Sequence, residues 1–252
     1  MAIPLDWPSG VPEKLQRQGY SRQPQDLVHR MKPDAGPPMR RLIDGAAAQS
    51  VKGVLSLSAA EAALFDAFLR DDLGNGLYRF NWTITDNGAA VVARLAAQPR
   101  LRRQAVRYLY ELDIACDAPA PSPAALSALA ALEDLGPAAW PGAVPFRPQR
   151  ASWSRQPDDQ IMRSAPDGFQ SQGLISRAGA DLVEIVLMLT SAQVSAFEAW
   201  FAAEAGFGVR DISFPDLGDG RTRGFFDSVY AVAPGNGDRW AISFRIGYEA
   251  VQ

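Results

Sequence analysis

The chain has 252 residues, of which 47% are hydrophobic and 21% charged, as is typical of a globular protein with one or two domains. Its 25 Lys and Arg and 28 Asp and Glu leave a net charge of −3, and neither half has the strongly basic surface of a duplex-DNA-binding protein. With only His29 and Cys116, the chain cannot form an internal disulfide, lacks the ligands of a Cys/His zinc site, and could build a Ser-His-Asp triad only around His29.

The sequence resembles itself at a nearly constant spacing. Residues 20–26 (YSRQPQD) recur 133 positions later as residues 153–159 (WSRQPDD), and Trp7-Pro8 recurs at the same spacing as Trp140-Pro141. From residue 51 onward the spacing is 132. A period this long is the size of a domain and too long for a solenoid repeat. The sequence therefore predicts a tandem duplication, with a first domain over 1–118, a linker with a short helix over 119–139, and a second domain over 140–252.

In chain order, each predicted domain has a polar arm and then an apolar strand, at residues 51–57 and 183–189. Ser58 and Thr190 each precede a Glu or Gln by three residues, a capping-box pattern that predicts helices near 59–71 and 191–204. Further strands are expected at 78–85, 89–95 and 107–115, and at 209–215, 224–230 and 240–248. We expect an α+β fold, mainly antiparallel, with two similar half-barrel or sandwich domains of about five strands and one helix each.

The arm carries the strongest local motif, Ser-Arg-Gln-Pro-x-Asp, which occurs in both halves. One interpretation is structural: Arg22 pairs locally with Asp26, and Pro24 fixes a turn. The other is that each arm contacts a neighbouring subunit. A catalytic role is disfavoured because no nucleophile–base pair accompanies the motif. The candidate interface residues, all in or beside the two arms, are Tyr20, Ser21, Arg22, Gln23, Pro24, Asp26, Arg30, Trp153, Ser154, Arg155, Gln156, Pro157, Asp159 and Arg163.

Other residues with chemical potential are better explained by structure. His29 and Cys116 align with Met162 and Tyr248 of the other half, so we expect a surface or interface histidine and a packed cysteine. The six tryptophans fall mostly at core positions of the duplication, which favours packing over sugar stacking. The Gly/Asp stretch at 216–221 lacks the ligand spacing of a calcium loop. We expect no catalytic residues, no metal and no cofactor.

The order of these elements resembles the phage minor tail protein M family. The features in common are a Gly-Tyr-Ser arm (residues 19–24), an apolar strand ending at Leu57-Ser58, an acidic-apolar helix, Gly76, and a Phe-x-Trp at residues 80–82. The helix carries Leu64, Phe65, Phe68 and Leu69 on one apolar stripe. The resemblance implies a structural protein with a tail-tube-like fold that forms a ring at the distal end of a phage tail. The family pattern is a single domain of about half this length, so the duplication is a departure from it.

The resemblance also implies partners: other copies of the chain, the tail tube protein, and the tail tip or hub proteins, with DNA passing through the channel without specific binding. Three chains would form a pseudo-sixfold ring, and six chains would form two layers. We expect no membrane insertion, because no apolar run is long enough to span a bilayer, and no secretory signal. The chain would belong to the virion tail, and to the host cytoplasm during assembly. The alternatives are another tail completion or terminator protein, or a two-domain carbohydrate- or host-binding module.

Overall fold

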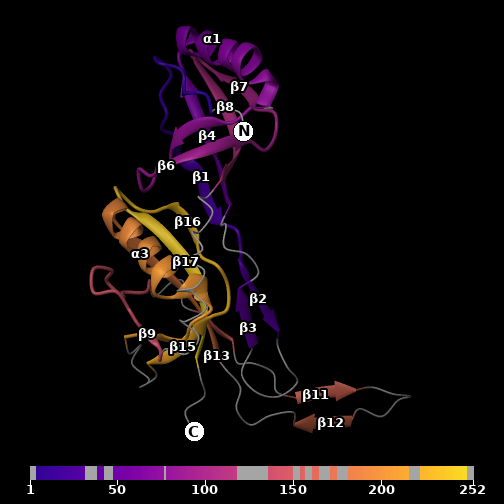
Figure 1. Ribbon diagram of the computed structural model, residues 1–252, viewed down its shortest axis with the longest axis vertical. Helices are drawn as coiled ribbons and strands as arrows, with labels where there is room; N and C mark the ends of the chain where they lie inside the picture. Colours follow the sequence, from indigo (N-terminus) through magenta and orange to yellow (C-terminus); the bar gives the residue numbers. More distant parts are fainter. Residues whose placement is uncertain are drawn as a thin grey trace.

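The structure is a computed structural model that describes residues 4–31, 39–42, 48–76, 78–117, 136–149, 154–156, 161–164, 171–174, 181–215 and 222–248. In this part of the chain the protein is mainly β, with two α-helices, and its mixed sheet does not close into a barrel (Figure 1). The expectation of mainly antiparallel strands with few helices is confirmed. The expected number of about five strands per half is wrong for both halves, because the described residues contain eight strands in the first half and nine in the second.

The first half, up to residue 117, begins with a long strand and a hairpin and continues with a helix packed on strands. Its elements are β1 (Gln16–Pro24), β2 (Val28–Met31), β3 (Met39–Leu42), β4 (Gln49–Leu57), α1 (Ala59–Ala67), a π-helical turn (Phe68–Asp72), a 3-10 turn (Gly74–Gly76), β5 (Phe80–Thr83), β6 (Ala90–Leu95), β7 (Arg100–Gln104) and β8 (Arg107–Asp117).

The second half, from residue 136, follows the same order. Its elements are β9 (Ala138–Ala139), β10 (Ser154–Gln156), β11 (Ile161–Ser164), β12 (Ser171–Leu174), β13 (Asp181–Leu189), α3 (Ser191–Ala203), a 3-10 turn (Gly206–Gly208), β14 (Ile212–Ser213), β15 (Arg223–Phe226), β16 (Ala231–Pro234) and β17 (Trp240–Tyr248). The linker helix expected over 119–139 falls mostly outside the described residues, and the last two residues of that range form β9.

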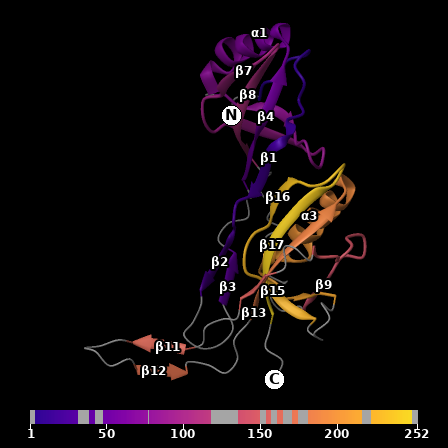
Figure 2. The same cartoon turned by 180° about the vertical axis from the view of Figure 1, so that it is seen from behind.

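One sheet runs through both halves. Its central path of antiparallel neighbours is β7-β8-β4-β1-β16-β17-β13-β10, and β1 is the strand at which the first half meets the second. Strand β6 also pairs with β8, and β15 with β17. The hairpins β2–β3 and β11–β12 form two small separate sheets. Figures 1 and 2 show the halves one beyond the other along the long axis, with β1 reaching from the first toward the second.

The two halves share their strand register. Strand β4 pairs with β8 from Gln49↔Cys116 to Leu57↔Tyr108, and β13 pairs with β17 over the positions 132 residues later. The indole N–H of Trp7 donates to the Val11 carbonyl at 3.0 Å, and that of Trp140 donates to the Val144 carbonyl at 2.7 Å. Equivalent sequence positions therefore occupy equivalent places in the sheet and in the loops that enter it.

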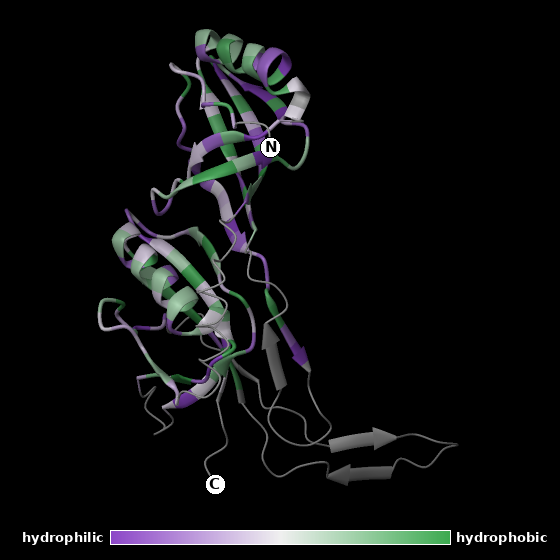
Figure 3. Cartoon of the chain, in the orientation of Figure 1, coloured by the Kyte–Doolittle hydropathy of each residue, from purple (hydrophilic) through white to green (hydrophobic). Residues whose placement is uncertain are grey.

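Each helix begins at a capping box, as expected, and packs aromatic side chains on the sheet. The Phe65 ring of α1 lies 5.0 Å from the Tyr110 ring of β8, and the Phe197 ring of α3 lies 5.9 Å from the Phe244 ring of β17. Burying each such side chain contributes about 1.5–3 kcal/mol. Buried residues alternate with more exposed ones along β4 and β8, and Figure 3 shows hydrophobic and hydrophilic residues mixed along the strands in this way.

The capping box of α1 gives a direct test of this local structure. The Ser58 side chain accepts from the Glu61 amide, and the Glu61 carboxylate accepts from the Ser58 amide at 2.6 Å. Ser58→Ala should lower the free energy of unfolding by about 1 kcal/mol, because an amide at the helix start loses its acceptor. Denaturant unfolding measures this change. Ser9→Ala, at an exposed serine, should leave the free energy unchanged, and equal effects of the two substitutions would contradict the capping role.

Candidate functional site

The first arm is the strand that joins the two halves. Residue Arg22 of β1 is paired in register with Val51 of β4 on one side and with Val232 of β16 on the other. Because β4 belongs to the first half and β16 to the second, a single residue of the arm lies between the two. The arm motif thus forms the junction of one continuous sheet.

Arg22 has no exposed surface and is surrounded by acceptors from both halves. Its Nε lies 3.1 and 3.0 Å from the two carboxylate oxygens of Asp86, which lies in the β5–β6 turn of the first half and is also fully buried. Its Nη2 forms a close ion pair with Glu198 of α3 in the second half, and its Nη1 donates to Gln49 at 3.0 Å. One guanidinium therefore bridges a carboxylate of each half. We call Arg22, Asp86 and Glu198 the junction cluster.

Two tyrosines complete the junction cluster's hydrogen bonds. The Tyr20 hydroxyl donates to Asp86 at 2.6 Å, and the Tyr230 hydroxyl donates to Glu198 at 2.9 Å. Burial, and then the neighbouring carboxylate, raises the pKa of each tyrosine, so both stay neutral donors. Burial alone would lower the pKa of Arg22, but Glu198 and Asp86 outweigh it, and the net shift is upward. The junction cluster thus holds a fixed positive charge between two carboxylates.

Further contacts surround the junction cluster. The Asn87 side-chain amide donates to Glu198 at 2.6 Å, so the β5–β6 turn touches α3 directly. The guanidinium of Arg17 lies 4.6 Å from the centre of the Trp240 ring and donates to the Gly237 and Arg239 carbonyls. The Tyr20 ring meets the same indole edge-on at 5.2 Å. Strand β1 is therefore held to the second half by backbone pairing, a buried charge and aromatic contacts.

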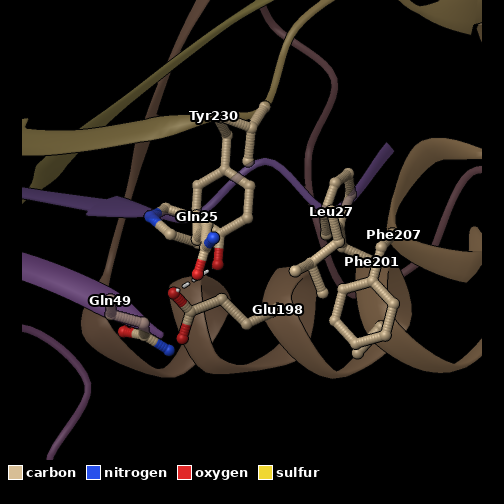
Figure 4. Close-up of a pocket in the computed structure, with 10 residues that line it drawn as sticks. Gln25, Leu27, Gln49, Glu198, Phe201, Phe207 and Tyr230 are labelled. Atoms are coloured by element: carbon tan, nitrogen blue, oxygen red, sulfur yellow. Dashed lines mark hydrogen bonds between the residues drawn. The ribbon is translucent and has the colours of Figure 1, made fainter. Parts of the chain in front are cut away.

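A small cavity of about 100 Å³ opens beside the junction cluster. Figure 4 shows its lining, with Glu198 and Tyr230 joined by their hydrogen bond and Gln25, Gln49 and Phe201 around them. Sites for small organic ligands usually enclose about 300–1,000 Å³. The polar atoms of Glu198 that face this space already bind Arg22, Tyr230 and Asn87. The cavity is a gap at a junction rather than a substrate pocket.

The structure contradicts the local interpretation of the first arm, and the contact of this arm with a neighbouring subunit stays a prediction. Arg22 does not pair with Asp26, whose carboxylate binds Arg30 at 2.5 Å, so the local pair assigned to Arg22 is wrong. Pro24 ends β1 rather than forming a turn. Ser21 and Gln23 are exposed on the strand. The first arm contacts the other half of its own chain.

The second arm lies at the far edge of the sheet. Ser154, Arg155 and Gln156 form β10, which pairs with β13 in the register that β1 uses with β4, and Arg163 lies in β11. Trp153, Pro157 and Asp159 lie outside the described residues. The prediction that this arm contacts a neighbouring subunit stays a prediction.

Sequence reasoning missed the acceptors of the junction cluster. Asp86 and Tyr230 have no acidic or aromatic counterpart in the other half, so the duplication carried no signal for them. Glu198 does have one, because Asp66 occupies the same position of α1. A carboxylate at the same helix position in both halves could have identified Glu198 as a candidate partner for the arginine of the arm.

The remaining candidates behave as structural residues. Burial raises the pKa of the Cys116 thiol to about 12, and His29 is exposed. Trp7, Trp82, Trp140, Trp200 and Trp240 all pack in or against the core, which confirms the packing interpretation for these five. Among the described residues, no cluster of His, Cys, Asp or Glu could hold a metal ion, and no helix could span a membrane. No family model matches this chain, and no curated protein matches it in sequence.

Removing the buried positive charge should destabilise the protein strongly. Arg22→Met leaves Asp86 and Glu198 without their cation, and breaking a buried pair in this way costs about 3–5 kcal/mol. Denaturant unfolding measures the loss. The matched control is Arg155→Met in β10, an edge strand, where we expect a change in the monomer of less than about 1 kcal/mol. Similar losses in the two variants would contradict the central role of the junction cluster.

The tyrosines predict a loss of stability in alkali. An unfolded tyrosine ionises near pH 10, whereas the raised pKa keeps Tyr20 and Tyr230 protonated in the folded state. Their contribution is complete below pH 10 and is lost as the pH rises, by at most about 1.4 kcal/mol per pH unit for each group. Unfolding at several pH values above 10 should give a shallower slope for Tyr20→Phe. An unchanged slope, equal to that of Tyr78→Phe at an exposed site, would contradict this assignment.

Proposed function

We propose that this chain is a structural protein of a phage tail, made of two related domains, whose copies form a ring between the tail tube and the tip or hub proteins. The observation that carries the proposal is the junction itself: two halves share one sheet through an arm whose motif occurs twice. A protein that assembles through its sheet needs strand edges that can pair with another strand, and a continuous sheet can form the wall of a channel. The resemblance to the minor tail protein M family agrees with this reading.

The proposed duplication has support beyond the sequence spacing. The β4–β8 and β13–β17 ladders share one register, and the hairpins β2–β3 and β11–β12 pair at corresponding positions. Gly76 and Gly208, which follow the helices, have φ angles of +96° and +88°. Added Cβ atoms there would lie 3.3 Å from Leu95 and 3.1 Å from Phe226, respectively. Two domains of common origin explain why such unusual positions recur.

The continuous sheet across the junction favours a ring of three chains over two layers formed by six chains. Within one chain the sheet passes laterally from the first half to the second, so further chains would extend it in the same direction. Three chains would then contribute six similar domains around one channel. In this arrangement DNA passes along the axis without specific binding, the protein has no enzymatic role, and it belongs to the virion tail after assembly in the host cytoplasm.

The mass of the assembled protein tests this proposal. Native mass spectrometry combined with negative-stain images should reveal a closed ring of about 82 kDa, three times the chain mass of 27.2 kDa. A ring of six chains with two layers would keep the structural function and change the arrangement. A protein that stays monomeric at high concentration, and also in the presence of the tail tube protein of its phage, would contradict the proposed function.

A further inference from the structure

The two terminal strands of the central path, β7 and β10, are the counterparts of β16 and β1, which pair with each other at its centre. Among the described residues, the terminal strand β7 pairs only with β8, and the terminal strand β10 pairs only with β13. Strand β10 corresponds to β1, because Arg155↔Val183 repeats Arg22↔Val51. Strand β7 corresponds to β16, because β7 pairs with β8 at Tyr110 and β16 pairs with β17 at Ile242, which lies 132 positions later. Strands β1 and β16 therefore pair within the chain, whereas their counterparts β10 and β7 lie at opposite ends of the central path.

The exposed side chains of β7 indicate that its free edge lacks a neighbouring strand in the described part of the chain. Leu101 pairs with Tyr110, as Val232 pairs with Ile242 at the corresponding position. Val232 is fully buried, with β1 alongside, whereas Leu101 is 52% exposed. Every residue of β7 is exposed. A hydrophobic residue on an open strand edge is a template for another strand.

The side chains that hold β1 to the second half have chemical counterparts at the two ends. Glu198, which binds Arg22 and accepts from Tyr230, corresponds to Asp66 on α1. Asp66 is exposed and accepts from the Tyr110 hydroxyl at 2.8 Å. Its charge is therefore available to a cation from another molecule.

The aromatic contacts of the central junction are retained in type as well. Tyr20 and Trp240, which meet edge-on, correspond to Trp153 and Tyr108. A cation–carboxylate pair and an aromatic pair are thus each divided between the second arm and the first half.

We propose that β10 of one molecule pairs antiparallel with β7 of a second copy, with Arg155 opposite Leu101. In this register Arg155 lies beside Asp66 of the second copy, as Arg22 lies beside Glu198. The contact joins two different surfaces, so it can repeat from chain to chain, and it closes into a ring when the rotation between successive chains completes a circle. The ring rests on the function proposed above, whereas the strand pairing stands on the two matching edges.

Cysteine trapping tests the register. Extending the antiparallel pairing of Arg155 with Leu101 by one residue places Gln156 opposite Arg100, at a Cα separation of about 4.5–5.5 Å, which a disulfide can bridge. Gln156→Cys mixed with Arg100→Cys should give a covalent dimer under mild oxidation, and neither variant alone should do so. Native Cys116 is buried and its pKa is raised to about 12, so it stays out of the reaction.

The control for trapping is Ser154→Cys mixed with Arg100→Cys, which the proposed register keeps too far apart to bridge. No dimer above this control overturns the proposed pairing. If native mass spectrometry still detects a closed ring, the ring uses another contact and the proposed function survives. If the protein stays monomeric at high concentration and also with the tail tube protein of its phage, both proposals fail.

A charge exchange tests the ion pair. Asp66→Arg should weaken self-association by about tenfold or more, because Arg155 then faces a like charge. The double variant Asp66→Arg with Arg155→Glu should restore association, since each contact regains opposite charges. Asp72→Arg, at another exposed carboxylate just beyond α1, should have little effect. Sedimentation velocity measures all four proteins, and a double variant no better than Asp66→Arg overturns the assigned pair.

Discussion

The buried charge of Arg22 is the constraint around which the rest of this structure is arranged. A guanidinium without solvent is tolerated only when carboxylates and hydrogen-bond acceptors surround it. Here Asp86 comes from a hairpin turn of the first half and Glu198 from a helix of the second, so the charge is satisfied only when the two halves are together. The orientation of α3 against the β5–β6 turn follows from this requirement.

The sheet adds a second constraint, because a strand can pair on only two sides. Strand β1 uses one edge for β4 and the other for β16, and Arg22 is paired at both. A slip of one residue would turn Arg22 away from its carboxylates and expose the neighbouring buried positions. Backbone register and buried charge thus select the same arrangement.

Sequence patterns predicted the parts of the fold that depend on local chemistry. The capping boxes at Ser58 and Thr190 located both helices, apolar runs rich in branched residues located β4 and β13, and alternation located β8 and β17. Strands β7 and β16 were missed because short strands at an edge, or rich in Ala and Pro, lack a clear period. The acceptors of Arg22 were missed for another reason. Asp86 and Glu198 lie 64 and 176 residues after Arg22 in the sequence, and only the three-dimensional fold brings them to it.

The covalent link between the halves has a consequence for the kinetics of assembly. A strand tethered to its partner experiences an effective concentration in the millimolar range, so β1 and β16 meet during the folding of each monomer. The proposed pairing between molecules would have no such advantage and would depend on the protein concentration. In the proposed ring, each chain would therefore enter solution with the contact between its two halves complete, and three chains would need fewer encounters than six separate domains.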